Sequence, residues 1–265
     1  MTEHFAMPTL ADFENAAPIV SRVARNTPLE SSRYLAEMLG VPKVYLKCEN
    51  LQRTGAYKLR GAYHLLSQLS HEDRARGVVA ASAGNHAQGV AFAARELGIK
   101  ATIFMPLGVA LPKLQATRRY GADVVLEGDA FDATLTASLA FVEETGAVFV
   151  PPFDHPAIVA GQGTVALEML DAAPEIETLV VAIGGGGRAP PGAAPAPPRP
   201  AQAGGGLRVI GVQSERTASF VPSLEAGHPL TIETRPTIAD GIAVARPGDY
   251  TFETVQRFID EVVTV

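Results

Sequence analysis

The sequence predicts an α/β fold built around open parallel sheets. Three observations lead to this prediction: short runs of apolar, mostly β-branched residues recur along the chain, segments with helical periodicity separate them, and glycine often ends those helices. Strands that are apolar on both faces are typical of parallel sheets covered by helices. With 265 residues, the chain can bury the core of one large domain or of two smaller ones.

The predicted elements alternate along most of the chain, after a stretch at 15–40 that mixes helical and turn signals. Strands are expected at 44–47, 78–81, 101–105, 124–126, 148–150, 179–183 and 207–212. Helices are expected at 58–69, 87–97, 113–120, 131–145 and 165–170. In the first of these helices, Leu59, Ala62, Tyr63 and Leu66 have the spacing of one buried face.

One segment interrupts this alternation. Residues 188–206 read RAPPGAAPAPPRPAQAGGG, and each proline inside a helix costs about 3 kcal/mol. We therefore predict a disordered or polyproline-like loop here. A helix would be the usual connection, because parallel neighbouring strands need a crossover between them.

Composition excludes several classes of function. The net charge of −6, with scattered basic residues, does not indicate a nucleic-acid or anionic-membrane surface. The one cysteine, Cys48, cannot form an internal disulfide and suits a reducing compartment. The N-terminus is polar and acidic, unlike a signal peptide, and no apolar run reaches the roughly 18 residues of a membrane span. We expect a soluble, cytoplasmic protein.

Lys58 is the first candidate for chemistry, because it stands where a loop leads into the helix expected at 58–69. Partial desolvation and a helix N-terminus both lower the pKa of a lysine. A lysine with a lowered pKa can form a Schiff base and later act as a general base. A solvated lysine on an amphipathic helix is the more ordinary interpretation of this position alone.

The second candidate is the turn Ser82-Ala83-Gly84-Asn85-His86, which lies between an expected strand and an expected helix. Small residues at a helix N-terminus let backbone N–H groups face an anion such as a carboxylate. Asn85 could also hydrogen-bond a ring hydroxyl. An ordinary strand–helix turn, capped by Ser82 or Asn85, explains the same residues equally well.

The third candidate is a run of four glycines, Gly184, Gly185, Gly186 and Gly187, directly after an expected strand. Such a run usually marks a close approach of the backbone, and its N–H groups can hold a phosphate. The run matches neither a Walker A sequence nor GxGxxG, so nucleotide binding is not indicated. A flexible linker is the alternative, and the Pro/Ala-rich residues that follow favour it.

Together and in this order, the three motifs resemble the tryptophan-synthase-β-like, fold type II pyridoxal-phosphate enzymes, and among them the threonine dehydratases (threonine ammonia-lyases). Similar stretches occur at 27–29, 151–154, 161–164 and 239–244. The resemblance covers nearly the whole chain apart from 188–206. It implies a two-domain, open parallel-sheet fold, with 1–76 and 156–265 forming the larger, cofactor-binding domain and 77–155 a smaller, mobile one.

The resemblance also implies a role for each motif. Lys58 would bind pyridoxal 5'-phosphate and remove the Cα proton, Asn85 would bond the ring oxygen, and the four glycines would hold the phosphate. The turn at 82–86 would bind the substrate carboxylate. The implied reaction converts L-threonine to 2-oxobutanoate and ammonia, and L-serine to pyruvate, in amino-acid metabolism leading to isoleucine. Members of the family tend to be dimers or tetramers, so a homo-oligomer is expected.

Several positions depart from the family's usual pattern. Ala56 stands where a serine often precedes the lysine by two residues. Racemases of this fold have a serine at the position of Ala83, so alanine favours dehydration over racemisation. Gln213 stands where relatives with a divalent-cation site often have glutamate, so we expect no strong metal site there. The run at 188–206 replaces an apolar helix and resembles a compensated reading-frame shift.

The chain stops at Val265. Relatives continue with a strand that carries the partner of the pyridine nitrogen, and some add a regulatory domain. We therefore expect the C-terminal part of the fold to be missing and no isoleucine feedback. Two alternatives stay open. One is an inactive relative, because losing a helix and strands removes more than the about 5–15 kcal/mol of a typical domain's stability. The other is a racemase or β-replacement enzyme.

Overall fold

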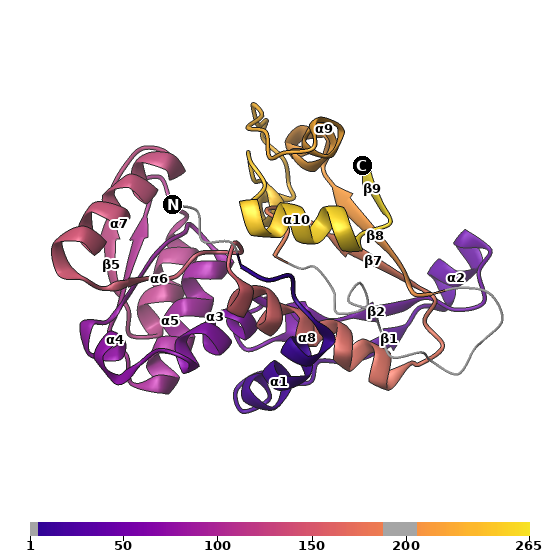
Figure 1. Ribbon diagram of the computed structural model, residues 1–265, viewed down its shortest axis with the longest axis horizontal. Helices are drawn as coiled ribbons and strands as arrows, with labels where there is room; N and C mark the ends of the chain where they lie inside the picture. Colours follow the sequence, from indigo (N-terminus) through magenta and orange to yellow (C-terminus); the bar gives the residue numbers. More distant parts are fainter. Residues whose placement is uncertain (1–4, 188–205) are drawn as a thin grey trace.

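The computed structural model describes residues 5–187 and 206–265. Helices surround two separate parallel sheets, one of four strands and one of three, and a short antiparallel ribbon lies beside them. Figure 1 shows the four-stranded sheet with its helices at the left and the three-stranded sheet at the right. The predicted α/β fold with parallel sheets is thus confirmed. The loop predicted at 188–206 lies, except for Gly206, outside the described residues.

The described residues form short strands and mostly longer helices. The strands are β1 (Leu29–Ser31), β2 (Tyr45–Lys47), β3 (Val78–Ala81), β4 (Ala101–Met105), β5 (Asp123–Leu126), β6 (Val148–Phe149), β7 (Thr178–Ala182), β8 (Arg208–Gln213) and β9 (Glu261–Thr264). The α-helices are α1 (Leu10–Val20), α2 (Arg33–Leu39), α3 (Lys58–Ser67), α4 (His71–Arg76), α5 (Asn85–Leu97), α6 (Leu111–Arg119), α7 (Phe131–Thr145), α8 (Pro156–Ala172), α9 (Phe220–Ala226) and α10 (Asp249–Phe258). Short 3-10 helices are η1 (Glu49–Leu51), η3 (Glu215–Thr217) and η4 (Asp240–Ile242).

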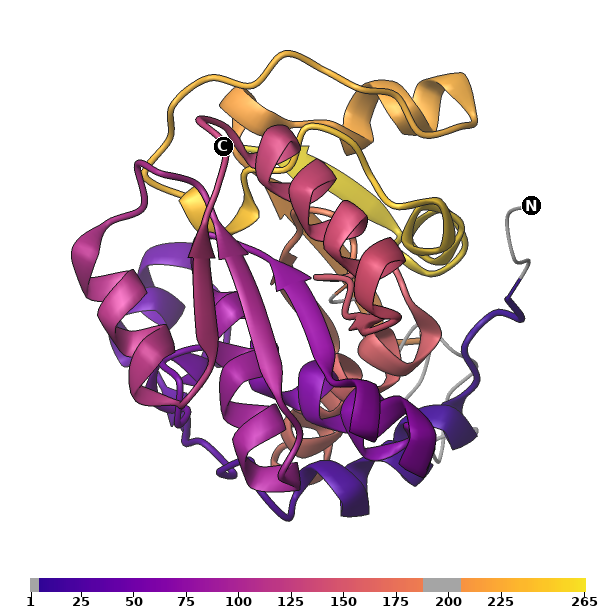
Figure 2. The ribbon, with the colours of Figure 1, turned by 90° about the vertical axis from the view of Figure 1, so that its left-hand side faces the viewer.

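The four-stranded sheet has the order β5-β4-β3-β6, and all its pairs are parallel. The chain runs outward from β3 through β4 to β5 and then returns to the other side of β3 with β6. Figure 2 faces this sheet. In open α/β sheets, ligands bind at the carboxyl ends of the strands where the connections reverse direction. The fold therefore points to the ends of β3 and β6 as the site.

Helices cover both faces of this sheet. Successive side chains of each strand point to opposite faces, so each strand contributes to two cores. Val78 and Ala80 of β3 lie in the core formed with α3 and α5. Val79, the residue between them, packs in a second core with Phe104 of β4 and side chains of α7. Burial on both faces explains why this strand reads as a continuous apolar run.

The three-stranded sheet has the order β7-β8-β9 and is also parallel. The parallel pairing of β7 with β8 was expected from the sequence, whereas β9 and α10 were not predicted. Helix α10 packs on this sheet through a core of Ile183, Phe220, Phe252 and Val255. The rings of Phe220 and Phe252 are stacked, with their centroids 6.4 Å apart.

Helix α3 lies between α5 and α8, and glycines allow both neighbours to come close. A Cβ on Gly161 of α8 would lie 2.7 Å from the carbonyl oxygen of Arg60. A Cβ on Gly89 of α5 would lie 3.0 Å from the backbone of Lys58 and Leu59. Helix α8 is longer than the predicted 165–170, because its glycines serve a helix crossing rather than a loop. None of the helices in the described parts of the chain is long and apolar enough to cross a membrane.

Candidate active site

The carboxyl ends of β3, β6 and β7 lead into three loops that meet. Strand β3 leads into the turn at 82–86, here called the asparagine turn, and β7 leads into the four glycines at 184–187, here called the glycine loop. Strand β6 leads into 150–154, which includes Phe153. A Cβ on Gly185 would lie 2.4 Å from the ring of Phe153, and one on Gly187 would lie 2.6 Å from its Cβ. The glycine loop therefore touches the loop that follows β6.

Lys58 is the first residue of α3, as predicted, and its side chain reaches the end of β6. The half-buried Nζ donates a hydrogen bond of 2.6 Å to the carbonyl oxygen of Pro152. The same ammonium lies 5.5 Å from the centroid of the Tyr57 ring and 6.0 Å from that of Phe153. The structure thus brings Lys58 to the point where the strand connections reverse, beside the glycine loop.

The asparagine turn leads into the N-terminus of α5. No side chain in the described residues caps this helix. The Ser82 Oγ instead accepts a hydrogen bond from the Gly84 N–H, at 3.1 Å, within the turn that precedes the helix. The first N–H groups of a helix have no partner within the helix, so they can bind an anion. Asn85 is exposed, and its Nδ2 lies 3.7 Å from the Cβ position of Gly241. Of the two sequence interpretations, this geometry fits the anion site better than the capped turn.

His86 belongs to the asparagine turn, but its side chain points into the protein. The side chain is buried, and the ring Nε2 lies 2.9 Å from the carbonyl oxygen of Val150. Since a carbonyl only accepts, Nε2 carries the proton and Nδ1 does not; Nδ1 has no partner among the described residues. Burial, together with the nearby charge of Lys58, lowers the pKa of His86 to about 3. Only its backbone N–H is therefore in a position to face a bound anion.

The glycine loop has the properties of a phosphate cradle. Within residues 5–187 and 206–265, no acceptor is bonded to the N–H groups of Gly184, Gly185, Gly186 or Gly187, and the last three residues are buried. Buried N–H groups normally find a partner, so these groups fit an anionic ligand. The loop is also too crowded for side chains: a Cβ on Gly184 would lie 2.9 Å from the Cα of Ile242. The residues present therefore fit a phosphate group.

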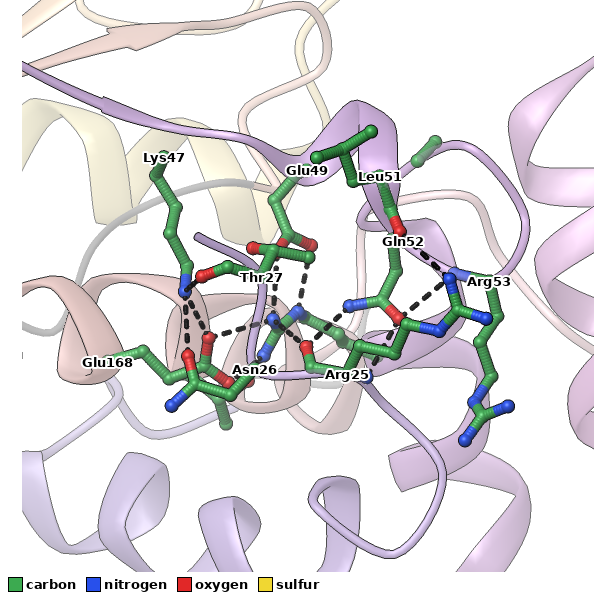
Figure 3. A network of polar contacts seen from close by, with 12 residues as sticks. Arg25, Asn26, Thr27, Lys47, Glu49, Leu51, Gln52, Arg53 and Glu168 are labelled. Carbon is green, nitrogen blue, oxygen red and sulfur yellow. Dashed lines mark hydrogen bonds and ion pairs between the residues drawn. The ribbon is translucent and has the colours of Figure 1, made fainter. Parts of the chain in front are cut away.

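A buried charge network holds the start of α3 and was not predicted from the sequence. Arg60 is fully buried and donates to both oxygens of Glu49, at 2.9 and 2.8 Å, and to both of Glu168, at 2.6 and 3.0 Å. Figure 3 shows Lys47 beside Glu168 and Thr27. The Lys47 Nζ lies 2.6 Å from Glu168. These partners come from β2, η1 and α8, so the position of Lys58 depends on distant parts of the chain.

Gln213, which suggested the absence of a strong metal site, lies at the end of β8 and is fully buried. Its Oε1 accepts the backbone N–H of Phe220 at 2.9 Å, and its Nε2 has no partner among the described residues. The amide oxygen is thus already used in a hydrogen bond to the backbone. The absence of a strong metal site stays a prediction.

Comparison with known proteins places this geometry in a family. Residues 20–265 match the family model described as "Pyridoxal-phosphate dependent enzyme". The chain is 48% identical to an L-threonine ammonia-lyase of Thermotoga maritima over 259 residues, which cover 98% of this chain and 63% of that protein. It is 46% identical to an L-threonine ammonia-lyase of Geobacter sulfurreducens, covering 91% of this chain and 59% of the relative. The chain thus spans about three fifths of the length of these relatives.

Solved structures give the same result. The processed form of threonine deaminase isoform 2 from Solanum lycopersicum superposes with a TM-score of 0.88 at 41% identity, covering 97% of this chain and 69% of that one. Maize serine racemase superposes with a TM-score of 0.90 at 32% identity, covering 98% and 77%. The resemblance inferred from the sequence motifs is confirmed. The chain belongs to the family of pyridoxal-phosphate dependent enzymes.

Proposed function

We propose that this chain is the catalytic part of a pyridoxal-phosphate dependent ammonia-lyase that converts L-threonine to 2-oxobutanoate and ammonia, and L-serine to pyruvate. One observation carries the proposal: the loop after β6 contacts the Lys58 amine, the glycine loop and the start of α5, through Pro152, Phe153 and Val150 in turn. The names of the Thermotoga maritima and Geobacter sulfurreducens relatives support the choice of threonine.

The cofactor would be held at both ends by residues of this chain. Lys58 would bind its aldehyde carbon through Nζ, and the N–H groups of the glycine loop would bind its phosphate. Asn85, exposed beside Gly241, would donate a hydrogen bond to the ring hydroxyl oxygen. When bound, pyridoxal phosphate supplies an electron sink for the pair left behind at Cα.

The protein's part in the reaction is to bind, orient and move protons. The N–H groups at the start of α5, in the asparagine turn, would hold the substrate carboxylate, helped by the positive end of the helix dipole. The Lys58 amine would then take the Cα proton as general base. The carbonyl oxygen of Pro152, 2.6 Å from Nζ, holds this amine at the end of β6 and can accept a hydrogen bond from either of its protonation states.

Closure of a smaller unit over the site belongs to the proposal, because it would keep water away from the reacting carbon. The resemblance to the family implies that this unit is 77–155 and that the larger domain is 1–76 and 156–265. Helix α3 shares one apolar core with β3, β4 and α5. Arg60 of the same helix is bound to Glu168 of α8, in the larger domain, so α3 lies at the boundary between the two units.

The assembly and setting of the protein are also part of this proposal. We expect a homo-oligomer, a dimer or tetramer, acting on a small amino acid in metabolism leading to isoleucine. A reducing, cytoplasmic compartment suits Cys48, which is a free thiol. Measurement of the molar mass in solution would test the oligomer directly.

Racemisation of serine is the second candidate function, and the superposition with maize serine racemase favours it. A racemase needs an acid on the face of the cofactor opposite the lysine. Ala83 offers no such group where the racemases of this fold have serine, so dehydration is the better-supported reaction. An inactive relative is the third possibility, raised by the proline-rich sequence at 188–206.

Product analysis separates these possibilities. The purified protein would be incubated with pyridoxal phosphate and with L-threonine or L-serine, and the 2-oxo acid, ammonia and D-serine would be measured. We expect 2-oxobutanoate and ammonia in equal amounts from L-threonine, and none from Lys58→Ala. D-serine without a 2-oxo acid would support the racemase, and no product with a folded, cofactor-loaded protein would refute the proposed lyase activity.

A further inference from the structure

The back of the glycine loop rests on the first turn of α10, a contact to which no role has been assigned so far. Thr251 of α10 is fully buried, and its Oγ1 donates a hydrogen bond of 2.5 Å to the carbonyl oxygen of Gly185. The Gly248 N–H donates to the same oxygen at 3.4 Å. The orientation of the Gly185 carbonyl is thus fixed by two hydrogen-bond donors at the start of α10.

Asp154 holds this turn of α10 from a different part of the chain. Its Oδ1 accepts the Thr251 N–H at 3.0 Å, and its Oδ2 accepts the Asp249 N–H at 3.0 Å. A carboxylate that accepts N–H groups at a helix N-terminus caps the helix and complements its dipole. Here the cap comes from the loop after β6, so Asp154 ties that loop to α10.

The hydrogen bond to Gly185 also fixes a neighbouring donor. A trans peptide unit is planar, and its C=O and N–H groups point in opposite directions. Holding the Gly185 carbonyl toward Thr251 therefore turns the Gly186 N–H away from α10. Gly186 has φ +97°, and a Cβ there would lie 2.8 Å from the Cβ of Thr251. Only glycine fits this position without strain.

The same short segment also holds the lysine. Pro152 accepts the hydrogen bond from Lys58 Nζ, and the ring of Phe153 covers Gly185. Asp154, next in sequence, caps α10 and so holds Thr251. Residues 152–154 therefore link the amine of Lys58 to the backbone donors of the glycine loop.

We infer that Thr251 is a positioning residue for the phosphate monoester of the cofactor, and that Asp154 keeps Thr251 in place. Thr251 does not touch the phosphate: its hydroxyl orients the Gly185–Gly186 peptide so that the Gly186 N–H meets the anion. This inference rests on the proposed function, which assigns the cofactor phosphate to the glycine loop. It adds α10, a helix late in the chain, to the parts that determine cofactor binding.

The test compares two ligands that differ only in the phosphate. Dissociation constants for pyridoxal 5'-phosphate and for pyridoxal would be measured from the absorption of the adduct with Lys58. Thr251→Val keeps the shape of the side chain and removes the hydroxyl. We expect it to weaken binding of the phosphate ester about tenfold, the upper range for one hydrogen bond, and to leave pyridoxal binding unchanged. Thr251→Ser keeps the hydroxyl, so its ratio of the two dissociation constants should equal that of the wild type.

Thr254→Val is the matched control. Thr254 is also a fully buried threonine of α10, but its hydroxyl donates to the carbonyl oxygen of Tyr250 within the helix, at 2.9 Å. It should leave the ratio of the two constants unchanged. Asp154→Asn keeps one acceptor oxygen of the cap and should shift the ratio in the direction of Thr251→Val, which gives a second route to the answer if Thr251→Val does not fold.

The outcomes separate this inference from the proposed function. If the wild-type protein forms no adduct with pyridoxal phosphate, the proposed function fails and this inference fails with it. If the wild-type protein binds the cofactor but Thr251→Val and Asp154→Asn keep the wild-type ratio, the positioning role alone is refuted. An equal loss of affinity for both ligands would likewise refute it, because a general loosening of the site does not depend on the phosphate.

Discussion

Replacing Arg60 by leucine should remove about 3 kcal/mol of folding stability. The guanidinium is fully buried and makes paired hydrogen bonds to Glu49 and to Glu168, whose side chains are 14% and 22% exposed. Removing one partner of a buried ion pair costs about 3–5 kcal/mol, because the remaining charge is left desolvated without compensation. Leucine can fill part of the volume, but it offers no donor to either carboxylate.

The structure favours the lower end of this range. The Lys47 Nζ stays 2.6 Å from Glu168, so that carboxylate keeps a cationic partner in the variant. Among the described residues, Glu49 keeps only a neutral donor, the hydroxyl of Thr27 at 2.6 Å. One carboxylate, rather than two, is therefore left without a charged partner. A loss of about 3 kcal/mol is a large part of the about 5–15 kcal/mol that stabilises a typical domain.

Urea unfolding followed by circular dichroism measures this loss. Arg76→Leu is the matched control, because Arg76 also pairs with two carboxylates, Glu72 at 2.9 Å and Asp73, but its side chain is 40% exposed. Ion pairs at the surface contribute about 0–1 kcal/mol. We expect the midpoint for Arg60→Leu to fall well below that of Arg76→Leu with a similar slope. Equal midpoints for the two variants would refute the reasoning from burial.

Two further predictions follow from the contacts around Lys58. Burial and the charge of Lys58 lower the pKa of His86 to about 3, against about 6.5 for a histidine in an unfolded chain. The unfolded chain therefore binds more protons below pH 6.5, and stability is lost as the pH falls from about 6.5 toward about 3. His86→Gln removes the ionisable ring and keeps an N–H donor for Val150. In urea titrations it should therefore lose less stability than the wild type between pH 6.5 and 5. An unchanged pH slope would contradict this. Gly89→Ala should push α5 away from the backbone of Lys58, where the new Cβ would lie at 3.0 Å, and cost about 1–3 kcal/mol. Thermal unfolding measures this cost, and a wild-type melting temperature would show that α5 can shift freely.

The sequence predicted the sheet strands well where burial on both faces imposes an apolar run. Strand β3 was predicted at 78–81 and occurs as Val78–Ala81. Helix α8 was predicted too short, because Gly161 resembles a loop residue in sequence but marks the point where α8 crosses α3. Local sequence patterns indicate propensity and periodicity, but they do not show which distant backbone segment a glycine packs against.

The three motifs of the site were found in the sequence, but their supports were not. Lys58 starts α3 as predicted, and the structure brings it to the glycine loop. Arg60 gave no local signal for its charge network, because its partners lie 11 and 108 residues away along the chain. Thr251 was missed for the same reason, since its contact with Gly185 spans 66 residues. His86 was assigned with its turn, yet its side chain points inward.

The visible absorption spectrum of the purified protein, titrated with pyridoxal 5'-phosphate, tests the central claim most directly. A Schiff base between a lysine and the cofactor aldehyde absorbs at longer wavelength than the free aldehyde. We expect this band for the wild-type chain and its absence for Lys58→Ala, with both proteins giving the same far-ultraviolet circular dichroism. A band of equal strength in both proteins would show that another lysine binds the cofactor. No band in a folded wild-type chain would contradict the assignment of this site to pyridoxal phosphate.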